Sequence, residues 1–410
     1  MAHRSNAGGS KKRPTRYGSA TTPLLATALR LHKKGELPAA KVAYRHAIEL
    51  DDCSVDAWLN LGAVEVALGS VRAARAAFER ALALAPDDAR VARDVGIGRM
   101  ALGLLADARA ALECAIALDS ALTGARLHLS RVCAELNDSF HAREHARMAV
   151  QAAPLEAATH LELHRAVFDD GDTRLAIDAA RRAVELDPSY SLAHYFLAGA
   201  LALQGEPARD DIAVDPGLVD GLRYAIRMRD GETRYFANRQ ETLRFALESA
   251  ALRGAVLELG VRFGVSTRVL ATGAPEVIAF DSFEGLPEAW SGRARGAFST
   301  GGEPPELPAN VRLQIGWFED TLPPFVATLQ KPLRLVHIDS DLYTSAATAL
   351  AALGAHIGAG TVIVFDEYIG NGSWRADEHR AFQEAVRRFG WRYEYLAFSW
   401  ITGQAVVRIT

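Results

Sequence analysis

The sequence predicts two architectures in one chain: an all-α solenoid of repeated helical hairpins, then an α/β sheet covered by helices. Three observations predict this division. Small residues recur with a period of 34 through the first half of the chain. Apolar runs of strand length alternate with helical segments in the second half. Five of the six tryptophans also lie in the second half, which indicates a change of architecture between the two halves.

The composition is that of an ordinary globular protein. The 410 residues are 49% apolar and 23% charged, with a net charge of −4, which argues against wholesale disorder and against a generally basic nucleic-acid binder. The first 20 residues carry only basic charges, at Arg4, Lys11, Lys12, Arg13 and Arg16. Because they lack an apolar core, we interpret residues 1–20 as a disordered basic tail and not as a signal peptide.

Two features of the sequence indicate where in the cell the protein is found: its cysteines and its longest uncharged stretch. Cys53, Cys114 and Cys133 are too few for a disulfide framework, so we expect buried thiols and a cytoplasmic protein. Residues 344–365 carry no Asp, Glu, Lys or Arg, but three glycines interrupt them. We therefore expect a helix followed by a buried strand there, and no membrane span.

Five repeats of 34 residues fill residues 21–190. They start at Thr21, Val55, Ala89, Thr123 and Ala157. Two positions are alanine in every repeat, namely Ala40, Ala74, Ala108, Ala142 and Ala176, and Ala47, Ala81, Ala115, Ala149 and Ala183. A turn position carries Gly35, Gly69, Gly103, Asn137 and Gly171. Alanine lets two helices approach closely, and Gly or Asn adopts the left-handed conformation of a turn, so the pattern predicts helix–turn–helix units.

This pattern resembles the tetratricopeptide repeat (TPR), with the best match at Trp58, Leu61, Gly62, Ala74, Phe78, Ala81 and Pro86. It departs at His164, where a small residue is usual, so we expect looser packing in the fifth repeat. A sixth unit starts at Ser191 and ends at Gly205 as a half-repeat. The resemblance implies a concave surface that binds a protein or peptide partner, or a contact between copies of the chain.

These features divide the chain into four parts: the tail (1–20), the solenoid (21–205), a linker (206–218) and the α/β domain (219–410). The linker is polar and acidic and includes Pro216. We therefore expect few contacts to cross it, and we expect residues from about 217 onward to fold independently.

The α/β domain is predicted as a Rossmann-like sheet of seven strands, mostly parallel, with one antiparallel strand. A helix over 233–253 precedes the first strand, and helices over 321–329, 344–357 and 377–389 lie between later strands. The strands are expected at 255–261, 276–282, 311–317, 333–340, 361–368, 391–398 and 404–410. Ligands of such sheets bind at the carboxyl ends of the strands.

The first two strand ends suggest an adenosyl ligand. Glu258 and Gly260 end the first strand, and Gly264 and Ser266 open the following helix. The spacing is G-x-x-x-G and not the G-x-G-x-x-G of a pyrophosphate loop, which argues against a nicotinamide dehydrogenase. Asp281, followed by Ser282, ends the second strand about 20 residues later, where an acid can accept both ribose hydroxyls. A helix cap is the alternative role for Asp281.

Two later strand ends bring acids together. Asp339 and Asp341 follow one strand, and Asp366 and Glu367 follow the next. Such a cluster is unfavourable unless a cation or a proton relieves the repulsion. Mg²⁺ prefers oxygen ligands, so the pattern favours a magnesium site over unrelated capping acids.

The strand ends together resemble the macrocin O-methyltransferase family. The matching segments are Glu258–Gly264, Ala279–Pro287, Gly316–Pro323, Asp339–Tyr343 and Asp366–Tyr368. Members of that family use S-adenosylmethionine and Mg²⁺ to methylate sugar hydroxyls. The resemblance implies a class I methyltransferase fold for residues 219–410.

The resemblance also implies individual roles. Asp339, Asp366 and Glu367 match the metal ligands, and Asp341 matches the general base. The predicted cofactor contacts are Glu258, Gly260, Gly264, Ser266, Asp281, Ser282, Trp317 and Asp339. Two positions depart from the family, since Glu367 replaces an aspartate and Ser340 replaces a glycine. The longer Glu367 is expected to bind the metal less tightly.

Acceptor contacts are less sharply predicted. The insert of residues 284–310 is rich in Gly and Pro and lacks periodicity, so we interpret it as a substrate lid. Tyr343, Tyr368, Trp374 and His379 are weaker candidates for the acceptor pocket, and packing within the core is the alternative for them.

The sequence therefore predicts a cytoplasmic, S-adenosylmethionine-dependent and Mg²⁺-dependent O-methyltransferase. The acceptor is expected to be a sugar hydroxyl on a free metabolite, a carrier-bound glycan or a glycosylated protein, with the TPRs recruiting the acceptor or a partner. No nucleic-acid partner and no membrane span are expected. A TPR adaptor with an inactive methyltransferase-like domain is the alternative, against which the intact Asp339, Asp341 and Asp366 argue.

Overall fold

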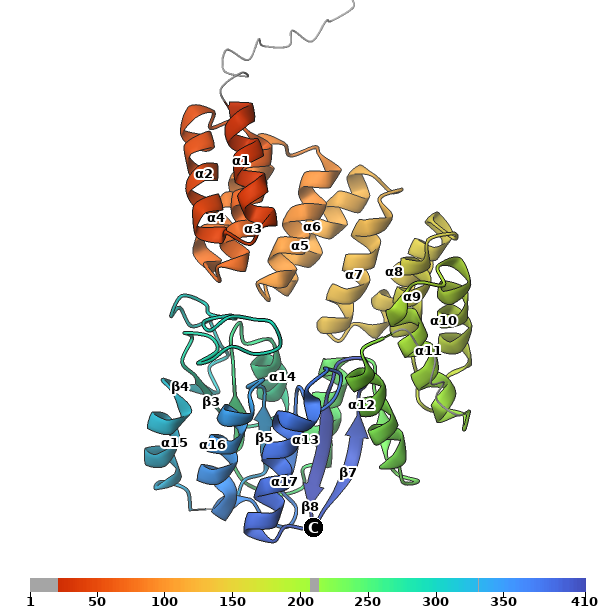
Figure 1. Cartoon of the computed structure of the whole chain (residues 1–410), viewed down its shortest axis with the longest axis vertical. Helices are drawn as coiled ribbons and strands as arrows, with labels where there is room; N and C mark the ends of the chain where they lie inside the picture. The colour runs from red at the N-terminus through yellow and green to blue at the C-terminus, as the bar shows by residue number, and fades with distance from the viewer. Residues whose placement is uncertain (1–20, 207–213, 331) are drawn as a thin grey trace, which may run out of the picture. The chain divides into compact units, whose positions relative to one another are not determined.

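Helical hairpins form the first half of the chain and a layered α/β sheet forms the second (Figure 1). The computed structural model describes residues 21–206, 214–330 and 332–410. The predicted basic tail and residues 207–213 of the predicted linker lie outside these ranges. A solenoid of helices followed by a mostly parallel sheet is thereby confirmed.

Every predicted repeat start is the first residue of a helix. These helices are α1 (Thr21–Lys33), α3 (Val55–Ala67), α5 (Ala89–Ala101), α7 (Thr123–Glu135), α9 (Ala157–Val167) and α11 (Ser191–Leu203). The second helices of the hairpins are α2 (Leu37–Leu50), α4 (Val71–Leu84), α6 (Leu105–Leu118), α8 (Ser139–Ala152) and α10 (Arg174–Leu186). Five helical hairpins and the single helix α11 thus lie at the positions of the five repeats and the half-repeat.

The repeat residues act as the pattern predicts, with one exception. The ten alanines of the two repeat positions are at most 2% exposed, so they do lie where paired helices touch. Gly35, Gly69, Gly103 and Asn137 have φ between 59° and 77°, the left-handed conformation expected of the turn. Gly171 is not among the residues with positive φ. The turn of the fifth hairpin is therefore built differently.

The fifth hairpin is also tightly packed, so the expectation of looser packing is wrong. The His164 side chain is fully buried and stacks on Phe196 with ring centroids 5.5 Å apart. Its Nδ1–H donates a hydrogen bond to the Ala176 carbonyl at 2.9 Å. In the second and third repeats the glycine at this position instead makes room for a side chain of the facing helix, Phe78 or Leu112.

The cysteines of the solenoid differ in burial, so the expectation of buried thiols is wrong for two of them. Cys133 is buried in α7, whereas Cys53 and Cys114 are exposed. Cys53 precedes α3, and Cys114 lies on the outer side of α6. The apolar character of a thiol predicts burial in general, but only Cys133 lies on a helix face that packs against a neighbour.

The chain forms two compact units, which meet in sequence between Pro86 and Asp87. The first unit contains α1–α4, and its core includes Tyr44, Leu61 and Val64. The second unit contains α5 and everything after it. The remaining TPR hairpins therefore belong to the same compact unit as the sheet.

The sheet has eight strands in the order β1-β7-β8-β6-β5-β2-β3-β4. They are β1 (Arg234–Tyr235), β2 (Val256–Leu259), β3 (Val277–Asp281), β4 (Val311–Ile315), β5 (Leu335–Ile338), β6 (Val362–Phe365), β7 (Tyr393–Phe398) and β8 (Ala405–Ile409). Strand β8 pairs antiparallel with β6 and β7, whereas the other pairs are parallel. The single antiparallel strand is as predicted.

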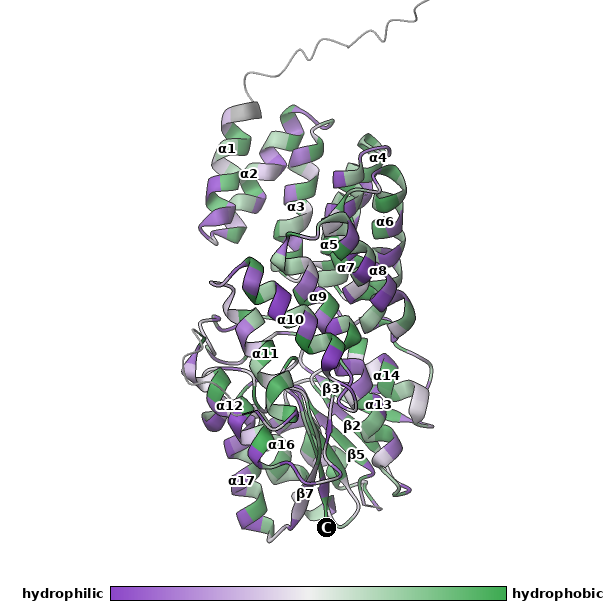
Figure 2. Ribbon diagram, turned by 90° about the vertical axis from the view of Figure 1, so that its right-hand side faces the viewer, coloured by the Kyte–Doolittle hydropathy of each residue, from purple (hydrophilic) through white to green (hydrophobic). Residues whose placement is uncertain are grey.

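Helices cover both faces of the sheet because its central strands are apolar on both sides (Figure 2). On one face, α13 (Arg239–Ser249) and α14 (Val265–Gly273) pack against residues such as Val256 and Val277. The other face carries α12 (Pro216–Arg227), α15 (Phe318–Val326), α16 (Tyr343–Leu353) and α17 (Glu378–Phe389). Short 3₁₀ turns at Gly354–His356 and Trp374–Ala376 complete the helical elements.

Two details differ from the sequence prediction. The sheet has an eighth strand, β1, whose two residues pair with Ala397 and Phe398 at the edge of the sheet. So short a pairing leaves no alternating pattern to detect in the sequence. The helix predicted over 233–253 is α13 alone, because residues 234–235 form β1 and Asn238 caps the helix by accepting the Gln240 N–H.

Many contacts cross the predicted linker, so that part of the domain prediction is wrong. Residues of α9–α11 belong to the same apolar cluster as the sheet and its helices. Phe168 packs edge-on against Trp400 at 5.3 Å, and the Tyr195 hydroxyl donates to the Trp400 carbonyl at 3.3 Å. The polar composition of the linker does not predict that the helices before it pack against the sheet after it.

Candidate active site

A cavity of about 420 Å³ lies at the carboxyl ends of β2, β3, β4, β5 and β6. This is where a sheet of this kind binds its ligands. Most of the predicted site residues line it: Gly260, Ser266, Asp281, Ser282, Trp317, Asp339, Asp341, Asp366 and Glu367. The structure therefore brings together residues that are spread over more than one hundred positions of the sequence.

The turn after β2 depends on two glycines. Gly260 has φ of 102°, and a Cβ there would collide with the carbonyl oxygen of Asp339. Gly264 has φ of 69° at the start of α14, where a Cβ would collide with Leu307. Gly260 lines the cavity and Gly264 does not. The first glycine thus brings backbone to the cavity, and the second lets the chain turn into the helix.

Asp281 holds this turn in place through three backbone amides. Its Oδ2 accepts the N–H groups of Val261 and Arg262 at 2.7 and 2.8 Å. Its Oδ1 accepts the Phe283 N–H at 2.7 Å. Since a carboxylate offers about four lone-pair sites, Asp281 has about one left for a ligand. Asp281 therefore combines a structural role with its place on the cavity wall.

Two of the acids lie close together at the bottom of the cavity. Ligand atoms of Asp339, Asp366 and His337 all lie within 4.8 Å of one another. Burial, then the charge of Asp366, raises the pKa of Asp339. Glu367 lines the same cavity, and burial followed by the charge of Asp366 raises its pKa well above the ordinary range. Burial, followed by the crowding of negative charge, thus raises the pKa values of the acids at this site.

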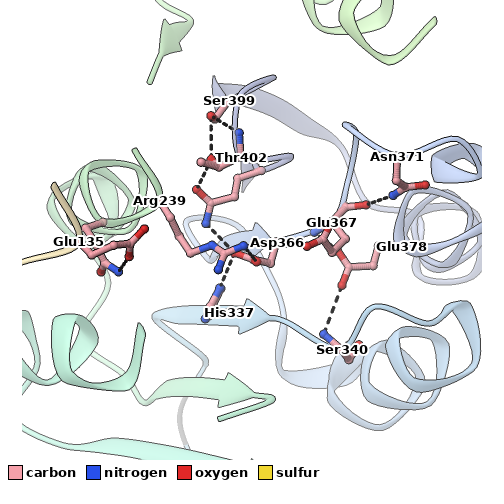
Figure 3. Close-up of polar contacts among 12 residues, drawn as sticks. Glu135, Arg239, His337, Ser340, Asp366, Glu367, Asn371, Glu378, Ser399 and Thr402 are labelled. Carbon is pink, nitrogen blue, oxygen red and sulfur yellow. Dashed lines mark hydrogen bonds and ion pairs between the residues drawn. The ribbon is translucent and has the colours of Figure 1, made fainter. Parts of the chain in front are cut away.

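Arg239 is the principal counter-charge, and it is absent from the residues predicted from sequence. Its Nη2 lies 2.7 Å from Asp366 Oδ2 and 3.9 Å from Glu367 Oε1 (Figure 3). Burial opposes the charge on Asp366, but Arg239 and His337 lower the pKa of that carboxyl. Arg239 lies at the start of α13, well before the first central strand in sequence, and no local motif marks it.

Behind the cavity, Glu258 and His337 form a buried pair. His337 Nδ1 lies 3.2 Å from Glu258 Oε1, and its Nε2 lies 3.6 Å from Asp366 Oδ1. Burial opposes the imidazolium, but the hydrogen bonds to Asp366 and Glu258 raise the pKa of His337 to about 10. Glu258, a predicted cofactor contact, is therefore not on the cavity wall; it supports the carboxylates through His337.

Two further side chains hold the loops that carry the acids. Glu378 accepts the Glu367 N–H at 3.0 Å and the Ser340 N–H at 3.5 Å (Figure 3). The Gln404 amide donates to Asp366 Oδ1 at 2.7 Å. Glu378 comes from α17 and Gln404 precedes β8, so neither could be linked to the acids by spacing along the chain.

Asp341 lies in the loop after β5, two residues from Asp339. It has φ of 60°, a conformation that few residues other than glycine adopt, and it lines the cavity. Burial, then the charge of Asp366, raises the pKa of Asp341 to about 6, while Arg239, Arg262 and Arg293 oppose that rise. A strained, cavity-lining acid with a pKa near neutrality is a candidate for proton transfer.

Comparisons with known proteins agree with this geometry. A family model described as a methyltransferase domain matches residues 257–368, which include the strand ends that line the cavity. Two tetratricopeptide-repeat models match residues 55–98 and 161–210. The chain carries a methyltransferase domain preceded by TPRs. A search of curated proteins found no match.

Solved structures similar to the chain include TPR proteins. One is YrrB, described as a TPR protein with an unusual peptide-binding site, at 22% identity, covering 42% of this chain and 89% of that one, with a TM-score of 0.34. Another is a thermophilic TPR protein of Thermus thermophilus, at 19% identity, covering 45% and 100%, with a TM-score of 0.38. Pseudomonas aeruginosa pilF matches at 18% identity, covering 47% and 87%, with a TM-score of 0.41.

The weaker acceptor candidates of the methyltransferase domain lie outside the cavity wall. Tyr368 and Trp374 are buried, and His379 packs edge-on against Trp374 at 4.8 Å. The Tyr368 hydroxyl is 2.6 Å from that of Tyr395. Tyr343 instead donates to Glu384 at 2.6 Å on the outer side of α16 and α17. The rings of Tyr368 and Trp374 hold helices on the sheet, where their large apolar area is buried.

The insert of residues 284–310 does border the cavity. Gly285, Leu286, Pro287, Arg293 and Phe298 are lining residues. The first half of the insert is closed on itself, since the N–H of Leu286 donates to the Ala297 carbonyl at 2.8 Å. Apart from the bridge between Trp290 and Arg293, the described insert contains no strand and no helix. It is a compact loop that forms one wall of the cavity.

Proposed function

We propose that the methyltransferase domain transfers a methyl group from S-adenosylmethionine to a sugar hydroxyl, with Mg²⁺ bound at the acidic cluster. The observation that carries this proposal is the shared cavity. Asp281 and the glycine turn lie on its wall together with Asp339, Asp341, Asp366 and Glu367. The resemblance to the macrocin O-methyltransferases supports oxygen as the acceptor atom and a sugar as the acceptor class.

The cofactor would lie along the ends of β2, β3 and β4. Gly260 and Ser266 expose backbone and hydroxyl groups there, and Asp281 and Ser282 offer oxygens for the ribose. Trp317 supplies an aromatic wall at the end of β4. Gly264 and Glu258 would act indirectly, through the turn and through His337. Asp339 borders both the cofactor side and the acidic cluster.

The residues of the cluster fit a hard divalent cation. Asp339, Asp366 and Glu367 offer carboxylate oxygens at one cavity, and the raised pKa values of Asp339 and Glu367 indicate that Arg239 alone does not balance the charge. When bound, S-adenosylmethionine supplies the methyl group and Mg²⁺ supplies the charge that lowers the hydroxyl pKa. Arg239 holds Asp366 at 2.7 Å, so it would orient that ligand.

Asp341 would act as the general base. Its carboxylate Oδ atoms can accept the hydroxyl proton, since its pKa of about 6 leaves it mostly ionised at neutral pH while remaining basic enough to hold a proton. Arg262 and Arg293 stabilise the ionised form. The insert covers the cavity from one side and would limit the access of water.

The TPRs would bring a protein or peptide partner, or an acceptor attached to one, to the domain. Contact between copies of this chain is the other use we propose for them. None of the described helices combines the length and the apolar character that crossing a bilayer requires. The three cysteines are unpaired, on which the proposal of a cytoplasmic protein rests.

The test is cofactor binding and methyl transfer by the full chain. Calorimetry should show S-adenosylmethionine binding, and labelled methyl from the cofactor should appear on a sugar-containing component of a cell extract. Asp341→Asn should lower turnover by about 10²–10⁴ with cofactor affinity kept. Asp339→Asn, the matched control, should lose activity that excess Mg²⁺ partly restores. A chain that transfers no methyl group, whether or not it binds the cofactor, would instead favour the adaptor.

A further inference from the structure

Two arginines on the cavity wall have no carboxylate partner. Arg262 follows the glycine turn after β2, and Arg293 lies in the insert. Across the described residues, no carboxylate oxygen lies within 4 Å of either guanidinium, whereas Arg239 in the same cavity is paired. Both side chains are exposed to the solvent of the cavity. Their charge is therefore available to a ligand.

The two guanidiniums are held by one aromatic ring. Arg262 Cζ lies 4.9 Å from the centre of the Phe298 ring, and Arg293 Cζ lies 4.7 Å from it. Arg262 also lies over Phe263 at 4.6 Å. Stacking on a ring uses the flat face of a guanidinium and leaves the N–H groups at its edge free to donate. The ring thus orders two cations without satisfying their donors.

The backbone around both arginines is fixed as well. Arg262 has φ of 48°, a strained conformation kept by the hydrogen bond from its N–H to Asp281. Arg293 and Trp290 exchange backbone hydrogen bonds at 2.7 and 3.0 Å. Both arginines act electrostatically on Asp341, which places their charge on the side of the proposed base. A preordered pair of donors at that side would meet the acceptor.

We propose that Arg262 and Arg293, ordered by Phe298, form a phosphate-binding subsite, and that the acceptor is a phosphate-bearing sugar. The inference rests on the proposed methyl transfer and narrows its substrate class. A guanidinium can donate two parallel hydrogen bonds to a phosphate. A phosphate also has more negative charge and more oxygens than a carboxylate, so it is the better ligand for two guanidiniums.

The cofactor offers a second source of negative charge, its own carboxylate, so the experiment separates the two. Calorimetry on the full chain, without metal and at saturating S-adenosylmethionine, would use inorganic phosphate, glucose 1-phosphate and glucose as probes. We expect both phosphates to bind and glucose alone not to bind. Cofactor affinity would be measured separately for each variant.

The variants are Arg262→Gln and Arg293→Gln, which keep a Cβ and a polar end but remove the charge. Each should weaken phosphate binding about tenfold, which is what the loss of one charge-assisted contact predicts, and Arg293→Lys should recover part of it. Arg295→Gln is the matched control, because Arg295 is an exposed arginine of the same insert that does not line the cavity. It should leave phosphate binding unchanged.

Three results would overturn the subsite. The first is equal phosphate binding by all variants, and the second is glucose binding as tight as that of glucose 1-phosphate. The third is a loss of cofactor affinity in the two glutamine variants with phosphate affinity kept, which would assign the arginines to the cofactor carboxylate. Failure of the wild-type chain to bind S-adenosylmethionine is a different outcome, because it contradicts the proposed methyl transfer on which the subsite depends.

Discussion

The TPR hairpins before Pro86 and those after Asp87 follow the same 34-residue pattern, but they bury different surfaces. In α1–α4 the core consists of repeat residues alone, such as Tyr44 and Leu61. In α9–α11 the apolar residues belong to the same cluster as the sheet. One sequence signature therefore builds two kinds of structure: a self-contained pair of hairpins, and hairpins that form part of the methyltransferase unit.

The hairpins of the second unit also reach the elements that carry the site. The Asn238 amide donates to the Ala134 carbonyl at 2.8 Å, and the Gln240 amide donates to Glu135 at 2.8 Å. These contacts hold the two neighbours of Arg239, the counter-charge of the acidic cluster. Phe263, in the turn after β2, lies against Gly103 so closely that a Cβ there would collide with it. The later repeats therefore support the site, and the first two hairpins do not share their core with it.

The largest expected effect is on folding and cofactor binding, when the chain is cut before residue 87 or before residue 217. Residues 87–410 should unfold cooperatively and bind S-adenosylmethionine, because they keep the whole second unit. Residues 217–410 should fail to fold, because they expose the apolar surface that α9–α11 cover, including Trp400. Thermal unfolding and cofactor calorimetry on both fragments test this. Cofactor binding by residues 217–410 with the affinity of the full chain would refute it.

Two glycine-to-alanine changes should separate the units. Gly199 lies on α11 against the Trp400 indole, and Gly62 lies on α3 against the Phe78 ring, so a Cβ at either position would collide with its neighbour. Overpacking of this kind costs about 1–3 kcal/mol, and the gain in helix propensity is the same for both changes.

Gly199→Ala should lower the midpoint temperature of the unfolding transition that S-adenosylmethionine shifts upward. Gly62→Ala, the matched control, should lower only the midpoint temperature of a second transition, which the cofactor does not shift. Calorimetric scans with and without cofactor distinguish the two. A common shift of both transitions by either change would mean that the units do not unfold separately.

The order of elements and the acidic cluster are predicted well from sequence, for a local reason. Short motifs mark the strand ends, and parallel strands bring their carboxyl ends to one edge, so the motifs alone place Asp339 and Asp366 together. The hairpin starts are predicted to the residue because the repeat is periodic.

The features that sequence does not predict depend on contacts between distant segments. Arg239 and Gln404 reach Asp366 from outside any motif. The aromatic residues Tyr368 and Trp374 follow the last acids in sequence, but their area is buried under helices and away from the cavity. The polar linker could not reveal that the helices before it share a core with the sheet. Spacing along the chain carries none of this information.

The altered turn of the fifth hairpin offers a smaller test of the same comparison. Asp170 there accepts two hydrogen bonds from Arg234 at 2.8 and 2.9 Å and one from the Tyr235 N–H at 2.8 Å, which ties the turn to β1. Its side chain is only 11% exposed, although Arg234 is half-exposed. After allowance for solvent screening at Arg234, Asp170→Ala should lower the free energy of unfolding by about 1–2 kcal/mol.

The control for Asp170 lies two residues away. Asp172 pairs with Arg174 at 2.6 Å in the same turn, but both side chains are exposed and neither touches the sheet. Asp172→Ala should leave the unfolding midpoint in denaturant unchanged, while Asp170→Ala should lower it. Equal midpoints for the two variants would show that the turn is not an anchor for β1.

The smallest expected effect is a pH dependence from His164, at the position where Gly62 stands in the second repeat. Burial lowers the pKa of His164 to about 4. Its Nδ1–H is used by the Ala176 carbonyl, and its buried Nε2 has no partner, so a proton there would be unsatisfied. The folded-state pKa lies below the unfolded value of about 6.5, so the unfolded chain binds the proton first and stability falls as the pH falls. Between pH 7 and pH 5.5 the free energy of unfolding should fall by about 1 kcal/mol because of His164.

His164→Leu removes the titrating group and should flatten that part of the plot of unfolding free energy against pH. The measurement is the difference in unfolding free energy between the two proteins, from urea unfolding at each pH. Parallel profiles for the two proteins would show that His164 does not titrate differently in the folded and unfolded chains.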